Sequence, residues 1–201
     1  MNGTGGNEGL ALQEASPQQL VLQARRRDAT SAVAFAELIR RFEKIALALA
    51  YSTLGDASLA GDVTQDAFLR AWQRLDELNE PQRFGAWLGR IVRNLALDAR
   101  RAQPRSELRG AFDDFDPPHE CDPGREMEDQ EMSQRIDKAL ATLDDQTRSA
   151  VVLRYYQNLS SREIGQLLDL SPAAVDMRLS RARAELKERL AWADPATNGT
   201  A

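Results

Sequence analysis

An acidic, proline-rich stretch divides the 201-residue chain and restricts what the chain can fold into. The stretch runs from Pro104 to about Met127 and contains four prolines. On both sides of it, apolar residues recur every three or four positions, as they do along helices, whereas the stretch itself has no such period. No strand pattern of convincing length occurs. The sequence therefore predicts an all-α fold, with two small helical domains joined by a flexible acidic linker.

Composition and helix-start signals give the predicted boundaries of the tails, the two domains and the linker. Residues 1–15 are rich in Gly, Asn and Thr and are expected to form a disordered tail. Ser16 followed by Pro17 is typical of a helix start, because serine caps the helix and proline suits its first position. The remaining predicted segments are a first domain at 16–103, the linker at 104–127, a second domain at 128–192 and a tail at 193–201.

The formal charge of −5 is unevenly distributed along the chain. The segment from Asp113 to Glu131 holds nine acidic residues and one arginine, which give it a charge of −8. The rest of the chain therefore carries +3. The acidity lies mainly in the connection between the domains, so the domains remain compatible with nucleic-acid binding.

Three long helices are predicted in the first domain. Their apolar faces carry Phe35, Leu38, Phe42, Ile45 and Leu49, then Phe68, Ala71, Trp72 and Leu75, then Phe84, Trp87, Leu88, Ile91 and Leu95. A neighbouring stripe of the middle helix comprises Asp62, Gln65, Asp66 and Leu69, and the other face of the third comprises Arg90, Arg93, Arg100 and Arg101. Trp72 and Trp87 are expected to pack in the core.

The segment LSSREIGQLLDLSPAAVDMRLSRARAEL, residues 159–186, predicts a helix-turn-helix. Ser160 and Glu163 fit a capping box, and Ser171 with Pro172 starts a second helix. Asp169 is expected in the turn because aspartate tolerates the left-handed conformation better than most residues. The second helix would present its basic face to the major groove of DNA. An amphipathic helical hairpin with a solvated basic face is the alternative.

Several classes of protein are disfavoured. Cys121 and His119 are the only cysteine and the only histidine, so neither a disulfide framework nor a metal or cofactor site is expected. Both lie in the predicted linker, where they cannot be held as nucleophile and base, so no enzyme is predicted. The apolar run Ile45–Ala50 is too short to cross a bilayer, and the N-terminus does not have the pattern of a signal peptide. A cytoplasmic protein is expected.

Over about residues 17–192 the chain resembles the extracytoplasmic-function group of bacterial RNA polymerase sigma factors. DVTQDAF…AW is similar to conserved region 2.2, F..WL.RI.RN…D..R to regions 2.3–2.4, and the helix-turn-helix segment to region 4.2. The resemblance implies a promoter-recognition subunit without catalysis of its own. Its implied partners are core RNA polymerase, through the β′ clamp helices and the β flap, promoter DNA, and an anti-sigma factor, with no small-molecule substrate.

The resemblance also implies which residues act. Region 2.2 assigns polymerase binding to Asp62, Gln65 and Asp66, although a solvated acidic face is the alternative for these residues. Regions 2.3–2.4 assign binding of the −10 element to Arg90, Arg93, Asn94, Arg100 and Arg101. Region 4 assigns binding of the −35 element to Arg154, Met177, Arg178, Ser180, Arg181 and Arg183. The chain departs from many relatives at Gly61, where they have an acid, and at Asp176, where they often have a base.

Two other functions remain open from the sequence. A stand-alone helix-turn-helix regulator would act without core polymerase, and a helical protein-interaction module would bind neither polymerase nor DNA. Dependence on core polymerase separates the first of these from a sigma factor.

Overall fold

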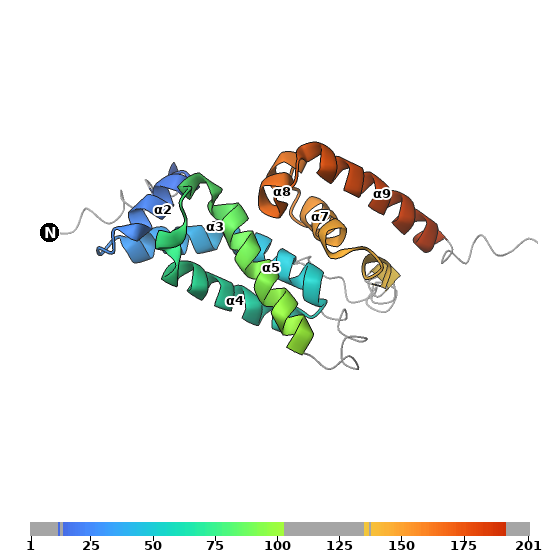
Figure 1. The fold of residues 1–201 in the computed structure, drawn as a ribbon, viewed down its shortest axis with the longest axis horizontal. Helices are drawn as coiled ribbons and strands as arrows, with labels where there is room; N and C mark the ends of the chain where they lie inside the picture. The colour runs from blue at the N-terminus through green and yellow to red at the C-terminus, as the bar shows by residue number, and fades with distance from the viewer. Residues whose placement is uncertain (1–11, 13, 103–134, 137, 192–201) are drawn as a thin grey trace, which may run out of the picture.

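The computed structural model describes residues 12, 14–102, 135–136 and 138–191, and within these ranges it contains helices and no strands (Figure 1). The α-helices are α2 (Pro17–Arg25), α3 (Ser31–Leu54), α4 (Ala57–Gln73), α5 (Phe84–Ala102), α7 (Asp145–Tyr155), α8 (Ser161–Leu168) and α9 (Pro172–Ala191). Two short 3-10 helices, η1 (Leu75–Glu77) and η2 (Pro81–Arg83), join α4 to α5. The all-α prediction is confirmed. The predicted linker, His119 and Cys121 lie outside the described residues.

Helices α2–α5 form the first domain, in which α3 packs against α2, α4 and α5. Leu20, Leu38, Leu49, Leu75 and Phe84 are fully buried in its core. Trp72 and Trp87 are partly exposed and pack against that core, as expected, and the ring of Trp72 lies 4.8 Å from that of Phe35. The apolar faces read from the sequence therefore lie where the helical period places them.

Local sequence signals account for the ends of these helices. Ser16 forms a capping box with Gln19 at the start of α2, and Pro17 occupies the first helical position. Gly55 ends α3 in the left-handed conformation, with φ 71°. Asp56 then caps α4 by accepting a hydrogen bond from the backbone of Leu59 at 2.8 Å. The turn between α3 and α4 is thus fixed by two adjacent residues.

Helices α7–α9 form the second domain, and α8, the turn and α9 make the predicted helix-turn-helix. The capping box of Ser160 and Glu163 is present, and Asp169 ends α8 in the left-handed conformation with φ 60°. The backbone N–H of Ala174 donates to Ser171 at 3.2 Å and so caps the start of α9. Val175, Leu179 and Ala182 are buried on the inner side of α9.

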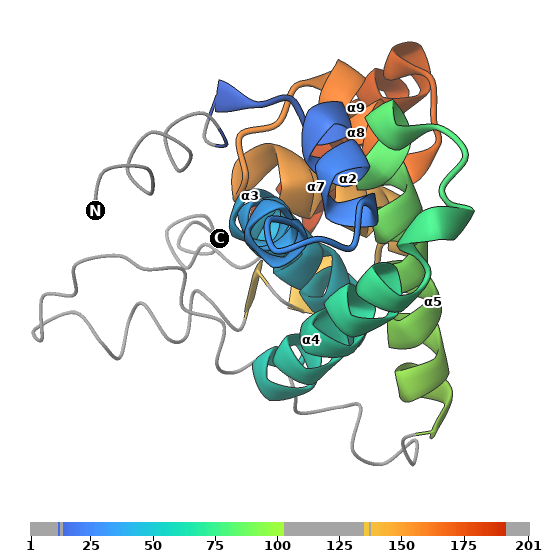
Figure 2. The same cartoon turned by 90° about the vertical axis from the view of Figure 1, so that its left-hand side faces the viewer.

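The two domains pack directly on each other. Helix α7 lies against α3, and α8 lies against α5, so one continuous cluster of buried side chains spans both domains. Helix α4 lies on the opposite side of the first domain from α7–α9 (Figures 1 and 2). This packing was not predicted from the sequence. It covers one flank of α5 and leaves the outer face of α4 uncovered.

Candidate nucleic-acid interface

The acidic stripe of α4, which comprises Asp62, Gln65, Asp66 and Leu69, points to solvent. The opposite face of the helix buries Val63, Ala67, Phe68 and Ala71 in the core. Leu69 is 59% exposed, which is unusual for leucine. The stripe therefore offers two carboxylates, an amide and one apolar side chain on a single rigid surface. At Gly61, nothing lies within 4 Å of the position a Cβ would occupy, so packing does not require glycine there.

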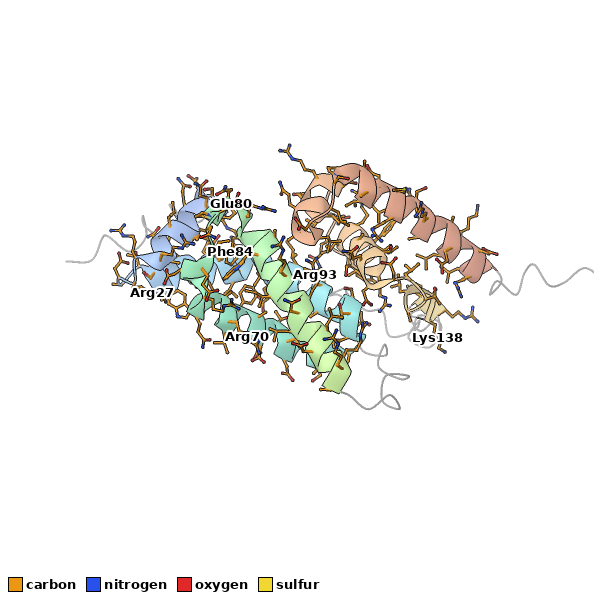
Figure 3. All side chains as sticks on the ribbon, viewed as in Figure 1. Arg27, Arg70, Glu80, Phe84, Arg93 and Lys138 are labelled. Atoms are coloured by element: carbon orange, nitrogen blue, oxygen red, sulfur yellow. The ribbon has the colours of Figure 1, made fainter. Side chains whose placement is uncertain are left out.

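The basic face of α5 is divided between solvent and the second domain. Asn94 and Arg101 are exposed, and Arg101 lies 3.5 Å from Asp98 of the same helix. Arg93, in contrast, lies on the side of α5 that faces the second domain (Figure 3), where Nη1 donates to the Leu167 carbonyl at 3.3 Å. Burial there lowers the pKa of the Arg93 guanidinium.

The other two arginines on this face pair with acids of the second domain. Arg90 donates through Nη2 to Asp169 Oδ2 at 2.6 Å, and Arg83 lies 3.3 Å from the same carboxylate. Arg100 donates through both Nη atoms to the two oxygens of Asp145, each at 2.8 Å. The hydrogen bonds from Arg90 and Arg100 lower the carboxyl pKa values of Asp169 and Asp145, respectively. These arginines are therefore bonded within the protein.

A buried arginine that the sequence analysis did not single out joins the two domains. Arg148 is 8% exposed and donates to the carbonyls of Leu140, Leu143 and Ser52 at 3.0, 2.9 and 3.1 Å. Ser52 belongs to α3, and its hydroxyl lies 2.9 Å from that of Ser149 on α7. One of its acceptors, the Ser52 carbonyl, lies 96 residues earlier in the chain, so helical periodicity gives no signal for this contact.

The helix-turn-helix presents a small outward face on α9. Ala173, Met177, Ser180 and Arg181 are exposed along it, and Met177 is 51% exposed. Met177, Ser180 and Arg181 are three of the residues to which the resemblance assigned binding of the −35 element. Arg183 is also exposed, and its Nε donates to the Leu179 carbonyl one turn earlier at 3.3 Å.

The remaining two predicted −35 residues contact their own domain. Arg154 donates to the Leu159 carbonyl at 2.8 Å and to the Ser161 hydroxyl at 2.7 Å. Arg178 reaches across to the start of α7, where it donates to Thr147 Oγ1 at 3.1 Å and to Gln146 Oε1 at 2.9 Å. Arg154 therefore ties α7 to the start of α8, and Arg178 ties α9 to the start of α7, contacts that helical spacing alone does not reveal.

Other kinds of site find little support in the described part of the chain. No group of three or more His, Cys, Asp or Glu side chains that could hold a metal ion occurs there. Within the same residues, no helix is both long enough and apolar enough to cross a membrane.

Comparison with known protein families matches each of the two domains to a family. Residues 38–106 match the family Sigma-70 region 2, and residues 133–186 match the family Sigma-70, region 4. The chain is 31% identical over 166 residues to the ECF RNA polymerase sigma factor SigW of Bacillus subtilis, covering 78% of this chain and 89% of SigW. It is 34% identical over 161 residues to the probable RNA polymerase sigma factor RfaY of Xanthomonas campestris pv. campestris. That match covers 78% of this chain but only 40% of RfaY.

A solved structure, that of CnrH in complex with the cytosolic domain of CnrY, resembles the protein with a TM-score of 0.62 and 30% identity. The similarity covers 90% of this chain and 99% of the CnrH chain. The two family matches together span more than half of the chain. The region 2 match falls on the first domain, and the region 4 match falls on the second. The chain therefore belongs to the sigma-70 family of RNA polymerase sigma factors, in its extracytoplasmic-function group.

Proposed function

We propose that the protein binds core RNA polymerase and directs it to promoters, where the first domain opens the −10 element and the second binds the −35 element. The observation that best supports this function is the presence of two separate exposed surfaces on one chain: the acidic stripe of α4 and the outward face of α9. A stand-alone regulator requires only the second surface.

The acidic stripe is the proposed polymerase-binding surface. Asp62 and Asp66 would face basic side chains of the β′ clamp helices, and Gln65 would add hydrogen bonds. Leu69 supplies an apolar contact at the end of the stripe, one turn after Gln65 and Asp66, where it can exclude water from the neighbouring polar contacts. The glycine at position 61 contributes no charge, so the contact would depend more on the two aspartates.

The basic face of α5 is the proposed track for the opened −10 strand. Strand separation exposes phosphates and unstacked bases, which arginines and a side-chain amide can hold. Arg90, Arg93, Arg100 and Arg101 would line the strand, and exposed Asn94 would pair with a base edge.

The outward face of α9 is the proposed reader of the −35 element. Met177 offers an apolar contact to a thymine methyl group, and Ser180 and Arg181 offer hydrogen bonds to base edges and phosphates. Arg183 is placed for a phosphate at the flank. Arg154 and Arg178 would contribute mainly by fixing the angle between the helices, with any contact to DNA made from that position.

The chemistry of RNA synthesis would belong to the polymerase, and this protein would have no reaction of its own. The β flap would receive the second domain. An anti-sigma factor is a further proposed partner, since CnrH has been solved in complex with the cytosolic domain of CnrY. We propose that this activity takes place in the cytoplasm, where bacterial RNA polymerase works.

The test is gel filtration of the purified protein with bacterial core polymerase, followed by transcription from a pool of promoter fragments. We expect co-elution and new transcription start sites. Asp62→Asn with Asp66→Asn should abolish co-elution, whereas Glu43→Gln with Glu188→Gln, which neutralises two exposed acids elsewhere, should not. DNA binding by the protein alone, without co-elution, would instead establish a stand-alone regulator.

A further inference from the structure

A small cavity lies beside the basic face of α5, where the connection from α4 joins that helix. Its volume is about 170 Å³, and its walls include Leu78, Asn79, Arg83, Trp87 and Arg90. Sites that enclose a whole small-molecule ligand usually measure about 300–1,000 Å³. The cavity is therefore of a size for one planar group of a larger ligand, which for the opened −10 strand is a single base.

One wall of this cavity belongs to a segment with little regular structure. Between the end of α4 and the start of α5, only the short helices η1 and η2 are regular, and Leu78 and Asn79 lie between them. Such a segment needs support from elsewhere in the domain to keep one shape. Helix α2 packs against both η1 and η2, although none of the described lining residues of the cavity belongs to it.

Arg25, the last residue of α2, binds the backbone of this segment at two carbonyls. Its Nε and Nη2 donate to the Leu75 carbonyl at 3.1 and 2.9 Å, and Nη2 also donates to the Leu78 carbonyl. Leu75 is fully buried and Leu78 is buried as well. Because a buried carbonyl without a donor is destabilising, Arg25 fixes the direction of both carbonyls and the point where Leu78 enters the cavity wall.

Arg27 holds the same segment a few residues earlier. Its guanidinium lies 4.7 Å from the centre of the Trp72 ring, and Nη2 donates to the Trp72 carbonyl at 3.3 Å. The same Nη2 lies 3.4 Å from Asp76 Oδ2 on η1. Since the Trp72 ring also packs on Phe35, Arg27 ties the end of α4 and η1 to the core of the domain.

We propose that Arg25 and Arg27 are positioning residues for the −10 strand, which keep the cavity in the shape that accepts one base. We refer to these two residues as the arginine clamp. Neither lines the cavity, so their effect passes through the carbonyls of Leu75 and Leu78 and through Trp72. The inference rests on the proposed role of α5 in opening the −10 element. A site held about 1 Å too loosely loses much of its selectivity.

The test uses holoenzyme made with the full-length protein and a promoter found in the transcription assay proposed for the function. The probe is a fluorescein-labelled fork whose −10 non-template strand is single-stranded, and each base of that strand is removed in turn to leave an abasic site. Anisotropy gives the affinity for each probe. With wild type, we expect removal of one particular base to weaken binding roughly tenfold, because stacking of a base on protein side chains contributes strongly to affinity.

The arginine clamp should determine this abasic penalty. Arg25→Met removes the donors to both carbonyls, and we expect the penalty at that one position to fall from about tenfold to less than about threefold. Arg27→Met, at an exposed position, should lower the penalty to a smaller extent. Arg26→Met is the matched control, since Arg26 lies between the two, is exposed and pairs only with the neighbouring Asp28 among the ion pairs described. It removes the same charge and should keep the penalty of wild type.

The outcomes separate the clamp from the proposed function. A variant that binds every probe more weakly by the same factor keeps its abasic penalty, and such a result for Arg25→Met and Arg27→Met would overturn the clamp alone. An equal fall in the Arg26→Met control would also overturn it. If Arg25→Met fails to co-elute with core polymerase, Arg27→Met decides the question. Wild-type holoenzyme without a penalty at any position would refute base binding in the −10 strand, and the clamp with it.

Discussion

The Ser161 hydroxyl on α8 donates a hydrogen bond to the Asp176 carboxylate on α9, and so ties the two helices of the helix-turn-helix together. Arg154 donates to the same hydroxyl at 2.7 Å, which places a cation, a hydroxyl and a carboxylate in one chain of contacts. Asp176 departs from the basic residue that many relatives have. Its contacts here explain an acid at this position through the internal structure of the domain.

Removal of the Asp176 carboxylate is expected to loosen this domain. Asp176→Ala leaves the Ser161 hydroxyl without its acceptor, and we expect a loss of about 1 kcal/mol in the free energy of unfolding. Urea denaturation followed by circular dichroism measures it. Asp176→Asn retains an acceptor oxygen and should lose less, while Ser180→Ala on the exposed face should have no effect on stability. Equal stability of the alanine variant and wild type would show that the contact contributes nothing.

Two glycines in helices are expected to respond to alanine with opposite signs. A Cβ at Gly165 would lie 2.5 Å from the Leu170 carbonyl oxygen, so Gly165→Ala must displace the turn and should cost about 1–3 kcal/mol. Gly61 has open space at the same position, and Gly61→Ala should stabilise α4 by up to about 1 kcal/mol through helix propensity. The midpoints of thermal unfolding of both variants, compared with that of wild type, test these two predictions. A higher midpoint for Gly165→Ala would contradict the close packing of Gly165 against the Leu170 carbonyl.

Acid should remove the contribution that Glu37 makes to the free energy of unfolding. Its carboxylate is 9% exposed and accepts hydrogen bonds from Arg40 and Arg41, which lower its pKa from 4.5 to about 2. Because folding favours the ionised form, this contribution is complete above about pH 4.5 and is lost as the pH falls toward 2.

Glu37→Gln should therefore be less stable than wild type at pH 7 and should show a flatter decline in stability between these pH values. The midpoint of urea unfolding, measured across the range, gives the slope. Glu43→Gln, an exposed position on the same helix, should keep the slope of wild type. A Glu37 variant with an unchanged slope would exclude the ion pairs as its source.

Arg178 and Arg181, two of the α9 residues to which the resemblance assigned binding of the −35 element, should behave differently. Arg178 bonds to Thr147 and Gln146, so Arg178→Ala should lower stability by about 1 kcal/mol and also weaken binding to −35 DNA. Arg181 is exposed, and Arg181→Ala should weaken DNA binding while changing stability by less than about 0.5 kcal/mol. Holoenzyme binding to promoter fragments and urea denaturation together test this. Equal stability losses for both would contradict the distinction.

Much of the fold follows from local sequence. The periods of α3, α4, α5 and α9, the capping box at Ser160 and the turn at Asp169 were all predictable, because each depends on residues within a few positions. The segment Leu78–Arg83, between the middle and third predicted helices of the first domain, contains the 3-10 helix η2. Short 3-10 turns have too weak a period to be predicted from sequence.

The candidate site was less predictable where distant segments meet. The exposed faces of α4 and α9 followed from helical spacing, because the position of a residue within a single helix determines which face it lies on. The burial of Arg93 did not, because its partner Leu167 is 74 residues away. Likewise, the resemblance assigned Arg178 to the −35 element, but whether its side chain faces DNA or the start of α7 depends on the packing of α7 against α9. Pairings of this kind arise from tertiary packing, which periodicity does not encode.

The aspartate in the turn has a consequence for engineering. Asp169 adopts the left-handed conformation in which glycine is often found. Its carboxylate also accepts a hydrogen bond from Arg90 of the other domain. A chimera that received its helix-turn-helix from a relative with glycine at this turn would fold in the same way but without that bond. If this module reads the −35 element as proposed, its exchange between such proteins would change promoter specificity and domain coupling together.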